Sequence, residues 1–298
     1  MCRLPSLALC DNALVVAFLS LFAFNALGAL AAGPSFARKA AALALSAVPY
    51  AVALAFPPED ALLRASVWVG AMFLTMRMLD VFAEARRPPA FRLGLMLCVL
   101  DLRTLRRERG FPTSLAARTL AYTALAALAF ATLPLWPRPF QWLGGAACLY
   151  VGMEAADAIV RLPLRLGGFA LRPLQHSPIR SRSLGEFWGR RWNREVSGLL
   201  SRWCFRPLAR RGHAGLGLAW AFTCSGLFHA ISVLSAAGWW DALTVLLFFM
   251  LHGALVSAER TMGIARWPAW AAHGWVVGAF AVTGPLFLDP VLRIFLLA

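Results

Sequence analysis

The feature that most limits how this sequence can fold is a series of long apolar runs. Eight of them occupy residues 13–32, 40–56, 61–79, 115–135, 140–160, 214–236, 242–258 and 269–288. A helix needs about 17–25 apolar residues to cross the hydrocarbon core of a bilayer, and each run reaches that length. Only 14% of the residues are charged, against roughly 25% in soluble domains. We therefore expect an all-α polytopic membrane bundle of about eight or nine transmembrane helices, formed by one domain over residues 1–298.

Three apolar segments need a separate interpretation. Phe91–Leu100 and Pro290–Ala298 are too short to cross a bilayer, and we expect the first to be interfacial or re-entrant. Ala29-Leu30-Ala31 has the form of a signal-peptide cleavage site. The apolar run that contains it is long for a signal peptide, and Arg3 is the only basic residue before it, so we expect a retained membrane anchor.

The basic residues lie in the loops between the runs, and basic and non-basic loops alternate. Seven arginines lie between residues 86 and 109, and twelve lie between residues 161 and 211. By the positive-inside rule these loops are cytoplasmic, and both chain ends lie on the opposite side of the membrane. The net charge of +15 therefore reflects membrane topology and lipid partners. Binding of nucleic acid is not expected, because it needs a soluble basic face.

One segment between the fifth and sixth runs is unusual. Residues 183–194 contain two Trp, three Arg and one Asn. Helical spacing places a set of apolar side chains on one face: Leu184, Phe187, Trp188, Trp192, Val196, Leu199, Leu200 and Trp203. A narrow polar strip lies beside them: Glu186, Gly189, Asn193 and Ser197. We expect a basic amphipathic helix in the membrane–water interface, for which anchoring is the simplest role.

Two histidines lie inside apolar runs. At a rise of ~1.5 Å per residue, His229 lies roughly 14 Å and His252 about 17 Å from the same side of the membrane. The short Gly238–Asp241 turn makes their helices antiparallel neighbours. An ionisable side chain at such depth indicates function, although hydrogen bonding between helices is the alternative. A neutral imidazole can take the proton of a hydroxyl group that attacks a carbonyl.

Other polar residues give weaker signals. Ser225 precedes His229 by four residues, but no G-x-S-x-G elbow or third triad member accompanies the pair. Glu154 and Asp157 share a helix face. They supply fewer acidic ligands than a magnesium–diphosphate site needs, so we expect them to pair with an arginine or to orient a histidine. The six cysteines include no C-x-x-C pair, and we expect no disulfide framework, no metal and no cofactor.

Four short motifs together resemble the wax synthase branch of the membrane-bound O-acyltransferase superfamily. They are Phe187-Trp188-Gly189-Arg190-Arg191-Trp192-Asn193, Ser225-Gly226-Leu227-Phe228-His229, Leu251-His252-Gly253 and Val282-Thr283-Gly284-Pro285-Leu286-Phe287. Their order and spacing match the family across about residues 180–290. The resemblance implies an enzyme that esterifies a long-chain or other lipophilic alcohol with the acyl group of acyl-CoA. It also implies a reaction without a metal and without an acyl-enzyme.

The resemblance also implies roles for single residues. Asn193 and His229 fall on the two hallmark positions of the family. His229 would be the general base, and Asn193 would hydrogen-bond the acyl donor or the carbonyl region of the substrate. Further candidates for substrate binding are Trp188, Trp192, Ser225 and His252. Arg190, Arg191 and Arg194 are candidates for the phosphates of CoA or for lipid headgroups.

One departure from the family pattern leaves the identity of the alcohol substrate open. Plant members typically carry Glu directly after the hallmark histidine, whereas this chain has Ala230. Acylation or acetylation of a sterol or a hydroxylated terpenoid is therefore an alternative. An alternative of another class is a membrane transporter or a lipid-binding scaffold, but a transporter should show inverted repeats, which the sequence lacks. The expected location is a membrane, and for a eukaryotic source that of the endoplasmic reticulum.

Overall fold

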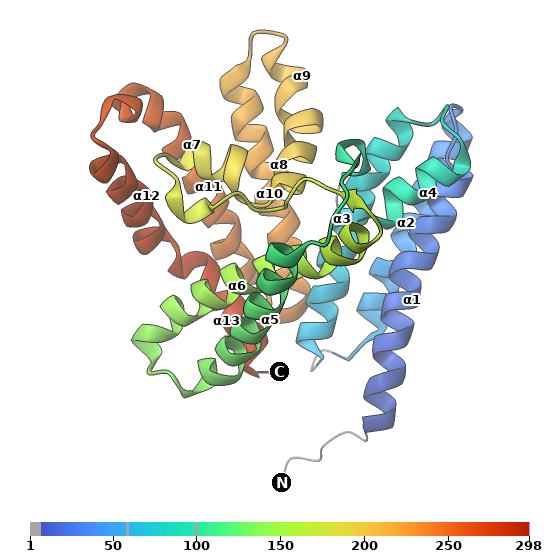
Figure 1. Ribbon diagram of the computed structural model, residues 1–298, viewed down its shortest axis with the longest axis horizontal. Coiled ribbons are helices and arrows are strands. Elements are labelled where there is room, and N and C mark those ends of the chain that lie inside the picture. The colour runs from blue at the N-terminus through green and yellow to red at the C-terminus, as the bar shows by residue number, and fades with distance from the viewer. Residues whose placement is uncertain (1–6, 58–59, 99–100, 298) are drawn as a thin grey trace. The chain divides into compact units, whose positions relative to one another are not determined.

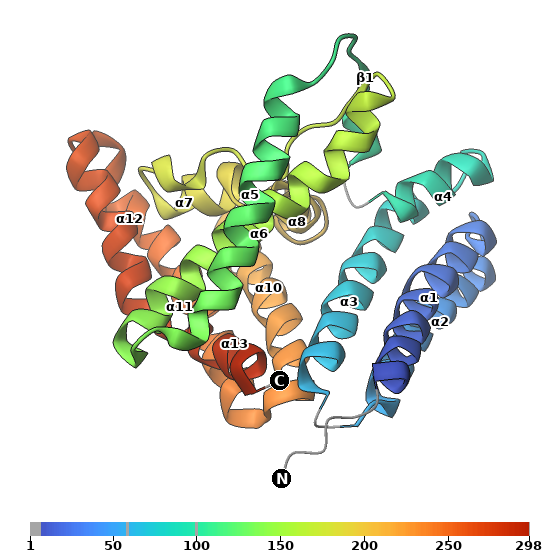
Figure 2. The same cartoon turned by 60° about the horizontal axis from the view of Figure 1, so that its bottom comes forward.

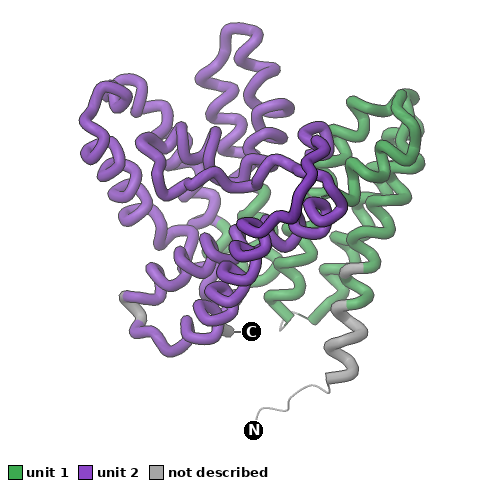
Figure 3. Tube along the Cα trace, in the orientation of Figure 1, with its two compact units in different colours: residues 1–99, 228–242, 297–298 green, residues 100–227, 243–296 purple. Residues whose placement is uncertain are grey.

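The computed structural model describes residues 7–57, 60–98 and 101–297 (Figure 1, and turned by 60° in Figure 2). Its described part contains seven helices long and apolar enough to cross a membrane, and a further apolar helix at Val15–Ala31. The expected all-α polytopic membrane protein is therefore confirmed. The chain divides into two compact units (Figure 3). Unit 1 comprises residues 1–99, 228–242 and 297–298, and unit 2 comprises residues 100–227 and 243–296.

Unit 1 begins with four helices that pack closely. They are α1 (Leu7–Ala31), α2 (Phe36–Ala55), α3 (Ala61–Ala83) and α4 (Pro89–Leu97), and α1 contacts each of the other three. Ala29, Ala42 and Ala71 have no exposed surface in their shared core. A Cβ atom at Gly28 would lie only 3.0 Å from the Ala42 carbonyl oxygen. Small residues let apolar helices approach to this distance, which explains the alanine-rich sequence of these runs.

The helix α4 contains most of Phe91–Leu100, the segment that we expect not to cross the membrane. It has 9 residues, too few to span a bilayer. Its Arg92 is 5% exposed. The Arg92 guanidinium donates to the carbonyl oxygens of Ala29, Leu30, Ala85 and Arg87 at 3.0–3.1 Å. The last carbonyls of a helix lack helical partners, so Arg92 caps the end of α1 and fastens the loop after α3.

The other membrane helices follow along the chain. They are α5 (Thr113–Thr132), α6 (Arg138–Leu166), α10 (Ala214–Ala237), α11 (Trp239–Met262), α12 (Ala269–Thr283) and α13 (Pro285–Leu297). α5 packs against α6. α10 and α11 are joined through Gly238 alone, with φ of 95°, a left-handed conformation that glycine adopts without strain. The expected short turn between these two helices is confirmed.

Short elements connect the long helices in unit 2. The 3₁₀ turns are η1 (Leu102–Thr104), η2 (Leu133–Leu135), η3 (Pro178–Arg180) and η6 (Ile264–Arg266). The strands β1 (Arg106–Arg107) and β2 (Phe169–Ala170) pair antiparallel, with Arg106 opposite Ala170 and Arg107 opposite Phe169. This pairing joins the loop before α5 to the loop after α6.

Two expectations about helix boundaries are wrong. We expected a separate apolar piece from Pro290, but Pro290 lies inside α13, and Gly284 alone separates α13 from α12. Together these two helices form one apolar stretch, Ala269–Phe295. Proline at position 285 has no N–H and a fixed φ, so it starts a new helix at this point.

The second wrong expectation is an unbroken amphipathic helix over residues 184–203. The segment consists of α7 (Leu184–Glu186), the π-helical turn η4 (Phe187–Arg191), α8 (Arg194–Leu200), a second π-helical turn η5 (Ser201–Phe205) and α9 (Arg206–Ala209). Trp192 and Asn193 interrupt it, and Asn193 has φ of 36°. Apolar spacing does not reveal this interruption, because tertiary hydrogen bonds produce it.

Candidate active site

The residues singled out from the sequence fall in both units. Unit 2 holds Trp188, Arg190, Arg191, Trp192, Asn193, Arg194, Ser225 and His252, and unit 1 holds His229. The segment 183–194 lies within unit 2. This segment contains most of the candidates, and it connects the long helices α6 and α10.

The start of the segment is held by a buried carboxylate. Glu259 of α11 is 8% exposed. Its two oxygens accept the backbone N–H groups of Leu184 and Gly185 and the indole N–H of Trp275. Three N–H donors thus satisfy the two oxygens of this buried side chain. Glu259 thus fixes the first turn of the segment against α11 and α12.

A second carboxylate stabilises the same turn from inside the segment. Ser183 Oγ accepts the Glu186 N–H at 2.9 Å, and Glu186 accepts the Arg182 N–H at 2.8 Å and Arg191 Nε at 2.7 Å. Burial raises the pKa of the Glu186 carboxyl, but these hydrogen bonds outweigh it, so the pKa lies below the ordinary value for glutamate. The Arg191 guanidinium therefore forms an ion pair with Glu186 within the same segment.

The π-helical turn brings the aromatic side chains of the motif together. The Trp192 N–H donates to the Phe187 carbonyl at 2.9 Å, and the two rings stack with centroids 5.6 Å apart. Five residues apart on a regular α-helix, these side chains would point in different directions. Trp188 lies among four rings, with centroid distances of 5.7–6.2 Å: Phe222, Phe248, Phe249 and Phe280.

Trp188 also reaches His252, which has no exposed surface. The Trp188 indole N–H donates to His252 Nδ1 at 2.9 Å, and His252 Nε2 lies 2.8 Å from Thr283 Oγ1. Because Nδ1 accepts, the proton of a neutral ring sits on Nε2 and points to Thr283. The Thr283 hydroxyl then donates to the Ala279 carbonyl at 2.7 Å. Both nitrogens of His252 are thus used in joining the segment to α12.

Replacing His252 by leucine should destabilise the folded chain by about 2–4 kcal/mol, because the buried donor on Trp188 and the hydroxyl of Thr283 lose their partner. Thermal unfolding of the full chain in detergent measures the loss. His252→Gln should recover much of the stability, since an amide can accept from Trp188 and donate to Thr283. Equal unfolding temperatures for His252→Leu and the unaltered chain would contradict this role.

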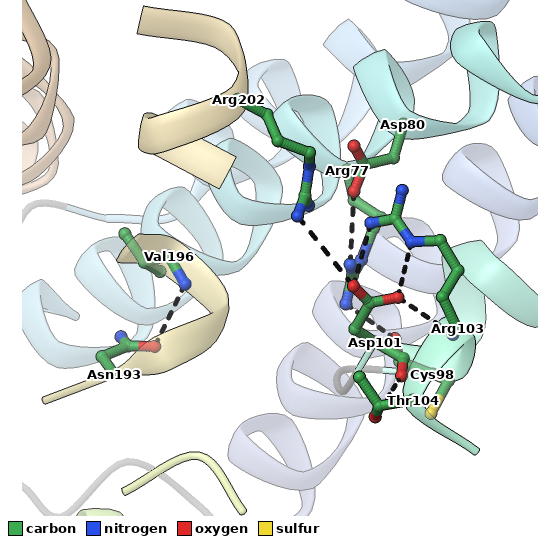
Figure 4. Close-up of polar contacts among 9 residues, drawn as sticks. All are labelled: Arg77, Asp80, Cys98, Asp101, Arg103, Thr104, Asn193, Val196 and Arg202. Carbon is green, nitrogen blue, oxygen red and sulfur yellow. Dashed lines mark hydrogen bonds and ion pairs between the residues drawn. The ribbon is translucent and has the colours of Figure 1, made fainter. Parts of the chain in front are cut away.

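Asn193 lies in the break between the π turn and α8. Its Oδ1 accepts the Val196 N–H at 3.4 Å, so the side chain caps α8. Figure 4 shows the amide oxygen directed at Val196 and the amide nitrogen on the opposite side. Asparagine tolerates left-handed backbone geometry better than most residues do. The side chain therefore combines a structural oxygen with an amide nitrogen that can donate to a ligand.

A neighbouring segment, Pro173–Ser177, holds this break in place. His176 N–H donates to the Arg191 carbonyl at 2.8 Å, and Arg194 N–H donates to the Leu174 carbonyl at 2.9 Å. Gln175 Oε1 accepts the Asn193 N–H at 3.1 Å. The Leu174 N–H in turn donates to Asp157 Oδ1 of α6 at 2.8 Å. The position of Asn193 thus depends on a carboxylate of a membrane helix.

The two carboxylates of α6 are paired with arginines, as one of our two interpretations predicts. Glu154 lies 2.9 Å from Arg118 of α5, and Asp157 lies 3.0 Å from Arg161. Beyond α8, Asp101 binds Arg103 through two hydrogen bonds of 2.8 and 3.0 Å and lies 3.9 Å from Arg202 of η5 (Figure 4). These carboxylates are thus all paired with arginines outside the segment 183–194.

The three candidate arginines differ in their surroundings. Arg191 also donates to the carbonyls of His176 and Ser177, and Arg194 Nη1 donates to the Pro173 carbonyl at 3.3 Å. Arg190 is exposed and has no hydrogen bond or ion pair within the described chain. Arg190 is therefore the one of the three whose whole charged group is available to an anionic ligand.

His229 lies in α10, in the part assigned to unit 1, and is half-buried. Its ring meets Phe228 edge-on at a centroid distance of 5.5 Å, and its carbonyl accepts the Ser232 hydroxyl at 2.7 Å. Ser225 in unit 2 is half-buried on the same helix. The residues that the structure describes contain no group of three His, Cys, Asp or Glu side chains that could hold a metal ion.

Two residues that shape this site do not belong to any of the short motifs. Glu259 and Gln175 contact the segment 183–194 from 75 and 18 positions away in the chain. A usable signal existed only for Glu259, an acidic residue at the end of an apolar run. Its three N–H partners could not be inferred, because they lie on other segments.

Known proteins resemble part of this chain. Residues 171–251 match the membrane bound O-acyl transferase family. The chain is 31% identical over 173 residues to probable long-chain-alcohol O-fatty-acyltransferase 7 of Arabidopsis thaliana, covering 53% of this chain and 51% of the relative. It is 33% identical over 162 residues to long-chain-alcohol O-fatty-acyltransferase of Simmondsia chinensis, covering 48% of this chain and 45% of the relative.

The match thus spans about half the length of these curated relatives. The family match over residues 171–251 includes Asn193, His229 and most of the aromatic residues around Trp188. The membrane helices and the polar break at Asn193 agree with this match. The chain is therefore similar to the membrane bound O-acyl transferase family over residues 171–251, and to long-chain-alcohol O-fatty-acyltransferases over about half of its length.

Proposed function

We propose that this chain is an acyl-CoA-dependent O-acyltransferase that esterifies a long-chain or other lipophilic alcohol within the membrane. The observation that carries the proposal is the match of residues 171–251, which coincides with the segment around Asn193 and with α10. The relatives are named for the transfer of fatty acyl groups to long-chain alcohols. Both substrates and the ester product are lipophilic or amphipathic, which suits an enzyme made of membrane helices.

The proposed chemistry is a direct transfer. His229 takes the proton of the alcohol hydroxyl while the alcohol oxygen attacks the thioester carbonyl carbon. A C–O bond forms, the C–S bond breaks, and the proton passes from the imidazolium to the CoA thiolate. The products are one ester and one CoA thiol, and no electron donor is needed. A neutral imidazole suits this role because its ordinary pKa lies near neutrality.

Other residues are assigned to binding. The Asn193 amide nitrogen is assigned to the carbonyl region of the acyl donor, because its oxygen already caps α8. Arg190 is assigned to the CoA phosphates, because a guanidinium forms charge-assisted hydrogen bonds with phosphate oxygens. Trp188 and Trp192 support the site through packing, since both rings lie within the aromatic group of the motif. Membrane lipids surround the apolar helices.

A panel of substrates tests the function. The purified full-length chain, in nanodiscs, is incubated with acyl-CoAs of several chain lengths and with primary alcohols, sterols or hydroxylated terpenoids. We expect esters of long-chain primary alcohols by mass spectrometry, with one free CoA thiol released for each ester. Alkanes of equal length, which lack the hydroxyl group, are the matched control and should release no thiol above the rate of hydrolysis.

The panel has two outcomes that contradict the proposal. No ester from any combination would contradict acyl transfer itself. A strong preference for sterols or terpenoids would contradict the choice of alcohol, and Ala230 would be the first residue to examine, because plant relatives typically carry glutamate there. Changing Ala230 to glutamate should then move the preference towards long-chain primary alcohols.

A further inference from the structure

Gln175 has a buried side-chain donor with an unmet hydrogen bond beside Asn193. Its side chain is 4% exposed. Its Oε1 accepts the backbone N–H of Asn193 at 3.1 Å, whereas its Nε2 has no partner among the described residues. Most buried polar atoms in proteins are hydrogen-bonded, so an orphaned donor needs an explanation. A bound ligand that presents an acceptor is such an explanation.

The orientation of the Gln175 amide follows from its partner. The Asn193 N–H needs an acceptor, and exchanging the oxygen and nitrogen of the amide would place two donors against each other. The oxygen therefore faces Asn193, and the NH₂ group faces away from that backbone contact. Gln175 thus presents a donor beside a residue whose own amide nitrogen is directed away from its capping contact.

The backbone around Gln175 is anchored on both sides. Leu174 receives the Arg194 N–H and donates to Asp157, and His176 donates to the Arg191 carbonyl. The donor is therefore held in place before a ligand arrives, which is the condition for an effective hydrogen bond to a reacting group. Arg194 Nε is a second buried donor without a partner in the described residues. Gln175 Nε2 and Arg194 Nε are thus two buried donors that a ligand with several hydrogen-bond acceptors could satisfy.

We propose that Gln175 is a substrate-binding residue whose Nε2 donates a hydrogen bond to the thioester carbonyl oxygen of the acyl donor. The assignment rests on the proposed function, which places the acyl donor at Asn193. It adds a residue that the sequence motifs do not include. A thioester carbonyl accepts hydrogen bonds and becomes more negative as an alcohol attacks it, so a fixed donor there favours the transition state.

Two ligands distinguish a hydrogen bond to the thioester carbonyl from contacts to the rest of the acyl-CoA molecule. S-palmitoyl-CoA contains the thioester carbonyl, and S-hexadecyl-CoA is a thioether that lacks it but keeps the rest of the molecule. Without an alcohol, binding of each to the full-length chain in nanodiscs can be measured at equilibrium. We expect the unaltered chain to bind the thioester about 10-fold more tightly than the thioether.

The matched variant is Gln175→Glu. Its carboxylate can still accept the Asn193 N–H, but it offers no donor to a carbonyl. We expect thioester binding to weaken about 10-fold and thioether binding to change less than about twofold. Gln141→Glu is the control, since the Gln141 amide, at the start of α6, donates to the Trp136 carbonyl in an exposed contact, and it should change neither affinity. Gln175→Met provides a second variant without the donor if Gln175→Glu folds poorly.

The outcomes distinguish this inference from the proposed function. Equal affinities of the unaltered chain for both ligands would overturn the role of Gln175 and leave acyl transfer standing. Equal weakening of both ligands in Gln175→Glu would also overturn it, because the side chain would then act only through the position of Asn193. A loss confined to the thioester supports the inference even if the alcohol panel gives no ester. Binding of neither ligand would overturn both proposals.

Discussion

Replacing His229 by alanine is expected to lower ester formation by about 10²–10⁴-fold, because a positioned general base contributes a factor of that size. The protein level and the unfolding temperature should remain close to those of the unaltered chain, since His229 is only half-buried. The loss should appear mainly in kcat, because the imidazole acts on the proton of the reacting hydroxyl and not on the bound acyl chain.

The controls for this prediction come from other histidines. His213 lies in an exposed loop, and His213→Ala should keep full activity. His252 is a poor substitute base, because Nδ1 accepts from Trp188 and Nε2 pairs with Thr283. Thiol release is measured for each variant at saturating alcohol. Full activity of His229→Ala would show that the base is elsewhere in the chain.

Replacing Glu259 by alanine is expected to cost about 3–5 kcal/mol of folding stability and to remove activity at the same time. The reason is that the Leu184 and Gly185 N–H groups and the Trp275 indole lose their only described acceptor at the start of the motif. Thermal unfolding in detergent measures the first effect. Limited proteolysis tests the reason for the loss of activity. Residues 182–194 should become cleavable once Glu259 no longer holds them.

The matched control for Glu259 is another glutamate of unit 2. Glu108 lies 2.9 Å from Arg165, but its side chain is 51% exposed. An exposed pair contributes about 0–1 kcal/mol, so Glu108→Ala should leave both stability and proteolysis nearly unchanged. Similar effects of the two substitutions would mean that the N–H groups at residues 184 and 185 find other acceptors, and that Glu259 does not position the motif.

Several features of the molecule could be predicted from the sequence because they depend on local composition. The apolar runs predict the membrane helices, since a bilayer accepts a backbone only when its hydrogen bonds are closed within a helix. Gly238 marks the turn between α10 and α11. The short motifs around Asn193 and His229 lie within the residues that match the membrane bound O-acyl transferase family, and they can be read from the sequence because they depend only on residue type and order. Pairing of Glu154 and Asp157 with arginines also follows from the cost of isolated buried charges.

The details of the site were decided by tertiary structure. A helical periodicity cannot distinguish an unbroken helix from one interrupted by a π turn, and the interruption at Trp192–Asn193 exists because Gln175 and Leu174 accept the two N–H groups that a helix would otherwise pair. The partners of His252, Glu259 and Gln175 lie on segments distant in sequence. Hydrogen bonds of this kind depend on directions and distances of a few tenths of an ångström, which only the folded chain sets.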